Sequence, residues 1–201
     1  MPVPRKARHG CVVQVLAALV FGVVVLLGVM ALVTPWGFYM GGHFHLIPQW
    51  SGWGQMHSKL AGDYALFVNF SPKTGRHLGL THVSGNAYLC TPLGEQYKLR
   101  LSGDFENPHG TDLQGKTAHL YANNYSTFSG GTAPSVDFRG KWSNPDLVLD
   151  DHGSLNRAFD PGGKLVTNQH MRPYVQEVVP LTLHEGDYSD FNAACAALKK
   201  P

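Results

Sequence analysis

The chain has 201 residues, of which 43% are hydrophobic and only 15% are charged, and its formal net charge is +2. Beyond the three cations that precede residue 11, 13 Lys and Arg residues are set against 14 Asp and Glu residues. This balance gives no basic face, so we expect no nucleic-acid partner. The 23 glycines and 13 prolines favour a β-rich fold with many turns over a helical bundle.

The first predicted element is an apolar helix over residues 11–33, preceded by a basic stub, residues 1–10, that is too short to fold. Gln14 is the only strongly polar side chain in this run. At about 1.5 Å per residue the helix is about 34 Å long, enough to cross a hydrocarbon core of about 30 Å. We therefore expect a transmembrane helix whose partner is the lipid bilayer.

The orientation of this helix follows from charge. Its three cations lie before it, and the next cation in the chain is Lys59. The positive-inside rule then places the stub in the cytoplasm and residues 34–201 in the periplasm, or outside the cell, on a plasma (inner) membrane. Small residues at Ala18 and Gly22 would let two such helices pack into a homo-oligomer.

A cleaved signal peptide is the alternative to a membrane anchor. Residues 29–31 have the small-x-small form of a cleavage site. The apolar run is nevertheless longer than the roughly 7 to 15 residues of a signal-peptide core. Its length therefore favours an uncleaved, single-pass signal-anchor.

Residues 34–60 form an aromatic and histidine-rich juxtamembrane segment that holds three of the four tryptophans. Trp36 and Tyr39 follow the span closely and suit the membrane–water interface, where such rings are partly buried. Trp50 and Trp53 either begin the domain core or offer a stacking surface, which makes them candidate ligand-binding residues.

Residues 61–201 are predicted to form a β-rich extracytoplasmic domain. Alternation of apolar and polar side chains begins at Asp63 and is clearest over residues 96–101, as expected for antiparallel strands with one wet face. The last long strand, residues 174–184, contains Pro180 and is expected to be an edge strand or to break there. Eight or nine short strands indicate an antiparallel β-sandwich or jelly roll, with a barrel as the alternative.

The chain is predicted to end in a short helix that runs through Leu198, capped by Asp187 or Ser189. This helix carries Cys195, which with Cys90 makes the only cysteine pair after the span. In an exported domain such a pair indicates a disulfide, and two free thiols are the alternative. Closing a loop of about 100 residues would contribute roughly 4 to 5 kcal/mol in the chain-entropy model.

Histidine is unusually frequent, with 11 residues, all but His9 after the span. His43 and His45 lie on the same side of an extended segment, and methionines stand near histidines. Imidazole with thioether is a ligand set suited to copper. The candidate metal ligands are therefore His43, His45, His57, Met40 and Met56. Shared protonation of the histidines below about pH 6 is a second interpretation.

No catalytic motif is found, so we do not expect an enzyme. Asp150 and Asp151 beside His152 are typical of a turn, and Ser154 lacks a nucleophile elbow. The leading hypothesis is a membrane-anchored module whose extracytoplasmic β-domain binds a ligand or a protein partner. The alternatives are a carbohydrate-binding or carbohydrate-active domain, and a periplasmic copper-handling protein.

Overall fold

The computed structural model describes residues 8–33, 35–59, 62–77, 80–106, 112–123, 134–156, 158–159, 165–166 and 179–198. The chain divides into two compact units, Met1–Pro35 and Trp36–Pro201, and each is described by itself. The first unit contains helix α1 (Arg8–Val33). This helix is long and apolar enough to cross a membrane, a property that it shares with signal sequences.

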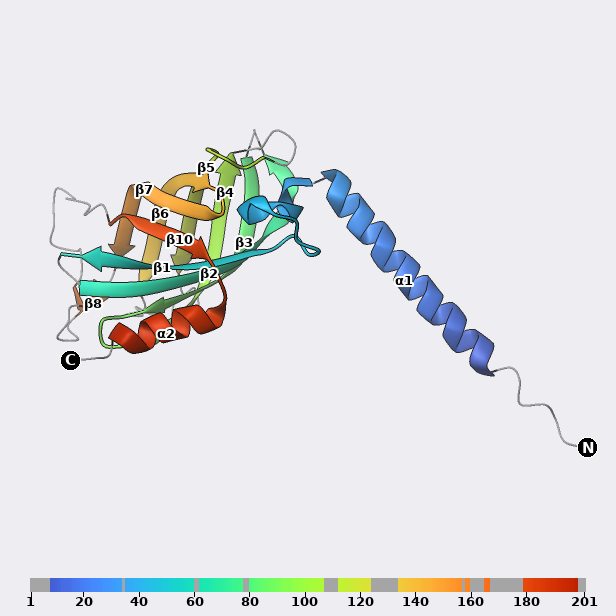
Figure 1. Cartoon of the computed structure of the whole chain (residues 1–201), viewed down its shortest axis with the longest axis horizontal. Helices are drawn as coiled ribbons and strands as arrows, with labels where there is room; N and C mark the ends of the chain where they lie inside the picture. Colours follow the sequence, from blue (N-terminus) through green and yellow to red (C-terminus); the bar gives the residue numbers. More distant parts are fainter. Residues whose placement is uncertain are drawn as a thin grey trace, which may run out of the picture. The chain divides into compact units, whose positions relative to one another are not determined.

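The second unit is a closed antiparallel β-barrel (Figure 1). Around the barrel the strands follow the order β1, β10, β7, β6, β5, β4, β3 and β2, and β1 pairs with β2 to complete the ring. A separate two-stranded sheet joins β8 to β9. The bounds are β1 Trp50–Ser58, β2 Gly62–His77, β3 Leu80–Cys90, β4 Gln96–Glu106, β5 Thr117–Asn123, β6 Ser135–Ser143, β7 Asp146–Asn156, β8 Ala158–Phe159, β9 Leu165–Val166 and β10 Leu181–Glu185.

The predicted β-sandwich or jelly roll is therefore wrong. Strand β10 pairs on one side with β7, where Leu181 lies opposite Leu149, and on the other side with β1, where His184 lies opposite Trp53. These two pairings remove both sheet edges. The alternation of apolar and polar residues could not distinguish the two folds, because sandwiches and small barrels both bury one face of every strand. Strand β10 begins directly after Pro180, and residues 174–178 of the strand predicted over residues 174–184 lie outside the described residues.

The barrel begins earlier in the chain than the alternation predicts, because β1 lies inside the segment 34–60. Its inward positions include Gly52 and Gly54. A Cβ on Gly54 would collide with the carbonyl oxygen of Thr182 on β10. Since two inward positions carry no side chain, the strand lacks the apolar alternation that would have revealed it.

The inside of the barrel is filled with apolar side chains. At one end four large rings contact one another, with centroids 5.2 Å apart for Trp50 and Trp142 and 5.5 Å apart for Phe70 and Phe105. An eight-stranded barrel is just wide enough for side chains to fill it. The core includes Trp50, Met56, Tyr64, Leu66, Val68, Phe70, Leu89, Leu99, Leu101, Phe105, Leu120, Phe138, Trp142, Leu147, Leu149, Leu181 and Leu183.

The segment before β1 packs onto this aromatic end. Two short 3-10 helices, η1 (Pro35–Phe38) and η2 (Met40–Gly42), bring Trp36 against the edge of Phe105 with centroids 6.3 Å apart. Met40 is fully buried in the core. We call residues 36–45 the plug. Trp36, expected at a membrane interface, is thus only 4% exposed, whereas Tyr39 is exposed.

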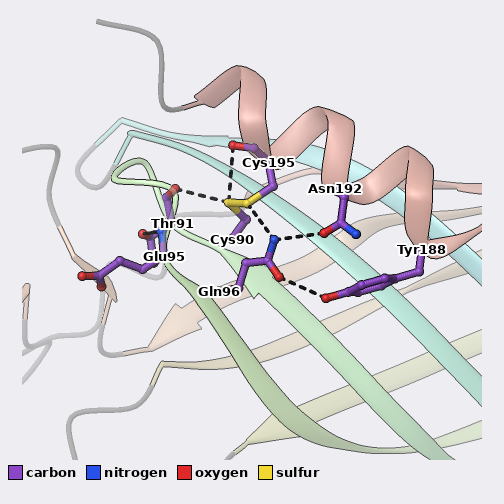
Figure 2. The surroundings of a disulfide bond; sticks show 7 residues. All are labelled: Cys90, Thr91, Glu95, Gln96, Tyr188, Asn192 and Cys195. Atoms are coloured by element: carbon purple, nitrogen blue, oxygen red, sulfur yellow. Dashed lines mark hydrogen bonds between the residues drawn. A yellow bond between two sulfur atoms is a disulfide. The ribbon is translucent and has the colours of Figure 1, made fainter.

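Helix α2 (Tyr188–Leu198) packs on the outside of β1 and β2 (Figure 1). As predicted, Asp187 caps it, since its carboxylate accepts hydrogen bonds from the backbone N–H groups of Ser189 and Asp190. The predicted disulfide joins Cys195 of this helix to Cys90 at the end of β3, with their Cα atoms 5.7 Å apart (Figure 2). A second apolar cluster fills the space beneath the helix: Ala65, Phe67, Cys90, Phe191, Ala194 and Cys195.

Candidate functional site

Two neighbouring rows of side chains cross the outer face of β1, β2 and β3. The pairing register places residues directly opposite each other on adjacent strands, where their Cβ atoms are about 4.5 to 5.5 Å apart. One row is polar and the next is aromatic, so neutral polar groups lie directly beside ring faces. The polar row is Ser51, Asn69 and Asn86, and the aromatic row is Trp53, Phe67 and Tyr88.

A groove with a volume of about 380 Å³ lies between these rows and the start of α2. This volume is within the roughly 300 to 1,000 Å³ of small-molecule sites, which combine apolar rings with a few polar groups. We call it the outer groove. Its lining residues are Ser51, Phe67, Asn69, Asn86, Tyr88, Asp187 and Tyr188.

Three rings give the outer groove its apolar surface. Tyr188 packs edge-on against Tyr88, with centroids 4.9 Å apart, and against Phe67 at 5.5 Å. Phe67 is buried, whereas Tyr188 is 37% exposed. Burial, and then the neighbouring Tyr88, raise the pKa of the Tyr188 phenol. The phenol therefore stays neutral at physiological pH and acts as a hydrogen-bonding group.

Asp187 places one negative charge at the rim of the outer groove. Its Oδ1 accepts hydrogen bonds from the Ser189 hydroxyl at 2.5 Å, the Ser189 N–H at 2.7 Å and the Asp190 N–H at 3.2 Å. The Ser189 hydroxyl, followed by the backbone N–H groups of Asp190 and Ser189, lowers the pKa of the Asp187 carboxyl. Asp187 is therefore ionised at neutral pH.

A hydrogen-bonded chain holds the wall that α2 contributes (Figure 2). The Tyr188 hydroxyl donates to Gln96 Oε1 at 3.0 Å, and Gln96 Nε2 donates to Asn192 Oδ1, also at 3.0 Å. One turn further along the helix, Cys195 is bonded covalently to Cys90 of β3. The helix is therefore attached to the barrel at two points, and Tyr188 keeps its position without a ligand.

A second group of polar side chains lies where the plug meets the end of β10. The rings of His43 and His45 have centroids 4.6 Å apart. Their Nε2 atoms lie 3.0 Å and 3.6 Å from Oε1 of Glu185, the last residue of β10. Three possible ligand atoms, one from each residue, lie within 4.8 Å of one another. We call these three residues the histidine cluster.

The structure brings together only part of the predicted copper set. His43 and His45 lie side by side, but the side chains of Met40 and Met56 are buried in the core. His57 is exposed on the outer face of β1, where its Nδ1 lies 2.5 Å from an oxygen of Asp63. Copper binding by the five residues stays a prediction, whereas Glu185 is a partner that the sequence gave no reason to include.

The two candidate ligand-binding tryptophans lie on opposite faces of β1. Trp50 is 1% exposed and belongs to the barrel core. Trp53 lies on the outer face, half-buried beside the cluster beneath α2, in the row that also holds Phe67 and Tyr88. Sequence reasoning missed the residues that line the outer groove, because only the register between strands shows that they are neighbours.

The acidic segment predicted as a turn lies within β7 instead. The register of β7 against β6 shifts where Arg139 faces His152 and Lys141 faces Val148. Two exposed carboxylates, Asp150 and Asp151, fall in this irregularity. Extra residues on one strand of a pair form a bulge, which bends the strand.

No protein-family model, curated protein or solved structure matches the chain. Function is therefore inferred from the outer groove and the histidine cluster themselves. The outer groove combines aromatic side chains with the amides of Asn69 and Asn86. The histidine cluster offers nitrogen and oxygen ligands.

Proposed function

We propose that the chain is a single-pass membrane protein whose extracytoplasmic barrel binds a neutral, polyhydroxylated ligand such as a carbohydrate in the outer groove. The observation that carries this proposal is the aromatic row beside the polar row. An aromatic ring offers a flat apolar face to the C–H face of a sugar ring. Asn side chains both donate and accept hydrogen bonds, as hydroxyl groups require.

The location of the ligand on the outside of the barrel follows from packing. The described part of the lumen is occupied by large side chains, among them Trp50 and Trp142, which are each 1% exposed. A ligand could enter only by displacing them. The outer groove is open, and Asp187 is the only charged side chain among its lining residues. A lining made mostly of neutral side chains favours a neutral ligand.

Two features support an extracytoplasmic barrel. The window Val12–Val29 of helix α1 is strongly apolar on average and carries no charge, and the Lys and Arg residues within the first 58 positions all precede this window. The Cys90–Cys195 disulfide is of a kind that persists in oxidising compartments. The proposed topology has a cytoplasmic N-terminus, an uncleaved signal-anchor in the plasma (inner) membrane, and the barrel in the periplasm or outside the cell.

Binding is tested with the full chain in detergent on a glycan array, followed by calorimetry with the best ligand. Asn86→Ala removes a groove amide from an exposed position and should weaken binding roughly fivefold to tenfold, the effect of one hydrogen bond. Tyr88→Ala should weaken it further. Gln55→Ala, which changes an exposed amide of β1 outside the outer groove, is the matched control. The proposal would be contradicted if no glycan on the array bound, or if neither Asn86→Ala nor Tyr88→Ala changed the affinity.

The topology is tested separately. A reporter enzyme that is active only outside the cytoplasm, fused after Pro201, should be active, and the same reporter fused at Met1 should be inactive. The mature protein should retain residues 1–33 by mass spectrometry. A mature N-terminus directly after Ala31 would instead identify residues 1–31 as a signal peptide.

A further inference from the structure

The histidine cluster differs from every other histidine site in the described part of the chain. Four histidines of the outer face each meet one carboxylate of a neighbouring residue: His57 with Asp63, His82 with Asp104, His119 with Asp137, and His184 with Asp146. In each of these pairs one imidazole contacts one carboxylate. At Glu185, by contrast, two imidazoles converge on a single carboxylate.

The backbone of the plug is shaped to make this convergence possible. His43 is extended, with φ −133° and ψ 163°, so His45 two residues later has its side chain on the same side. The His45 N–H donates to the Phe38 carbonyl at 2.7 Å, and the fully buried Met40 fixes the preceding turn. The two imidazoles are therefore held together before any ligand arrives.

Gly41 leaves room for the carboxylate. Its φ of +82° is in the left-handed region, and a Cβ there would lie 2.6 Å from Glu185 Oε2 and 3.2 Å from Trp50 Nε1. Trp50 Nε1 is buried and has no hydrogen-bond partner among the described residues. A buried donor without a partner is costly. This donor faces the same small space as the second oxygen of Glu185.

We infer that His43, His45 and Glu185 bind a divalent transition-metal ion of the Zn²⁺ or Cu²⁺ type. Two imidazoles and one carboxylate are the protein ligands of open zinc sites, in which water takes the fourth position. The His43 and Glu185 side chains are 58% and 24% exposed, so water can reach such a position. Site affinities for first-row metals peak at Cu²⁺ and are also high for Zn²⁺.

The contacts of the cluster indicate which ions suit it. His45 Nε2, the nitrogen that lies 3.6 Å from Glu185 Oε1, is also 2.8 Å from the Met40 carbonyl oxygen, and this contact holds the ring beside the carboxylate. The carboxylate supplies one negative charge to the ion. Hard cations such as Ca²⁺ prefer six to eight oxygen ligands, which the cluster does not offer. The methionine thioethers lie in the core, so the ligand set is nitrogen and oxygen rather than sulfur.

The site is tested on the full chain in detergent after removal of metals with a chelator. Titration calorimetry with Zn²⁺, and separately with Cu²⁺, should show one tight site per chain, and Ca²⁺ should give none. His43→Ala and Glu185→Gln should each weaken that site at least tenfold. His184→Ala is the matched control, because it removes the adjacent exposed histidine of β10, whose carboxylate partner is Asp146, and it should leave the affinity unchanged.

The unfolding temperature is a second measurement, which distinguishes a variant that has lost metal binding from one that has lost its fold. A saturating concentration of Zn²⁺ should raise the unfolding temperature of the wild-type chain and of His184→Ala, but not that of Glu185→Gln. The metal-free variants should unfold close to the wild-type temperature, because the substituted groups are partly exposed. Absence of a tight site, or a site that survives both His43→Ala and Glu185→Gln, would overturn the inference. Glycan binding by the outer groove is independent of either result.

Discussion

The two faces of the barrel wall are built from the same strands but differ in what their side chains do. On β2, Leu66 and Val68 point inward and are at most 1% exposed, whereas Phe67 and Asn69 point outward. The large inward side chains form one apolar cluster. We therefore expect the inner face to contribute most of the free energy of unfolding. The outer face carries the outer groove. In this barrel the lumen is packed with side chains, and the candidate site lies on the outer wall.

The outer face is itself divided. Beneath α2 it is apolar, and Phe67 and Cys90 are nearly as buried as the inner core. Away from α2 it is polar, with His–Asp pairs such as His57 with Asp63 and His119 with Asp137. Helix α2 therefore turns one part of an ordinary wet surface into a second, smaller core, and the outer groove lies at its border. Three predictions, each based on its own substitutions, separate these regions.

The largest effect is expected inside the barrel. Trp142→Ala should lower the free energy of unfolding by about 3 to 5 kcal/mol, because it leaves a cavity among packed rings. Trp53→Ala is the matched control, since it removes the same side chain from the half-buried outer face of β1. Denaturant unfolding of the full chain should show a clearly smaller loss for this control. Equal losses of unfolding free energy in Trp142→Ala and Trp53→Ala would mean that the inner face does not contribute more to stability than the outer face.

An intermediate effect is expected beneath α2. Replacing Cys90 and Cys195 together by Ala should lower the free energy of unfolding by about 2 to 5 kcal/mol, since the bond joins residues 105 positions apart. It should also weaken ligand binding, because Tyr188 loses one of the two attachments of its helix. Reducing agent should reproduce both effects in the wild-type chain and change nothing in the double variant. If the double variant kept wild-type stability and affinity, the Cys90–Cys195 bond would not be needed to hold α2 on the barrel.

Local features of the fold were predictable from the sequence because they depend on nearby residues. The apolar helix, the cap at Asp187 and the alternating strand at residues 96–101 all follow from short patterns, and the structure contains each of them. The disulfide was predictable as well, because Cys90 has only one possible partner in an exported domain. Closure of the barrel was not predictable, because it depends on β10 pairing with both β7 and β1.

The candidate sites were also predictable only where they depend on residues close together in the sequence. The pair His43 and His45 was visible because two residues separate like-facing side chains in an extended segment. Glu185 was not visible, since it reaches the pair only through the closing strand. The groove residues Asn69 and Asn86 were recognisable as outward positions of two strands, but their register was not. A site assembled across strands requires pairings that alternation along one strand does not contain.

The smallest effect is expected on the polar part of the outer face. His57→Ala should change the free energy of unfolding by less than about 0.5 kcal/mol, because His57 and Asp63 are 70% and 61% exposed and water screens their attraction. Denaturant unfolding at neutral pH measures this change, and Asp63→Asn should behave alike. The same variants should leave Zn²⁺ affinity intact, whereas His43→Ala should lower it with an equally small loss of metal-free stability. A large loss of stability in His57→Ala would show that this one-to-one pair is structural. Similar loss of Zn²⁺ affinity in His57→Ala and His43→Ala would show that pairing two imidazoles with one carboxylate confers no special affinity.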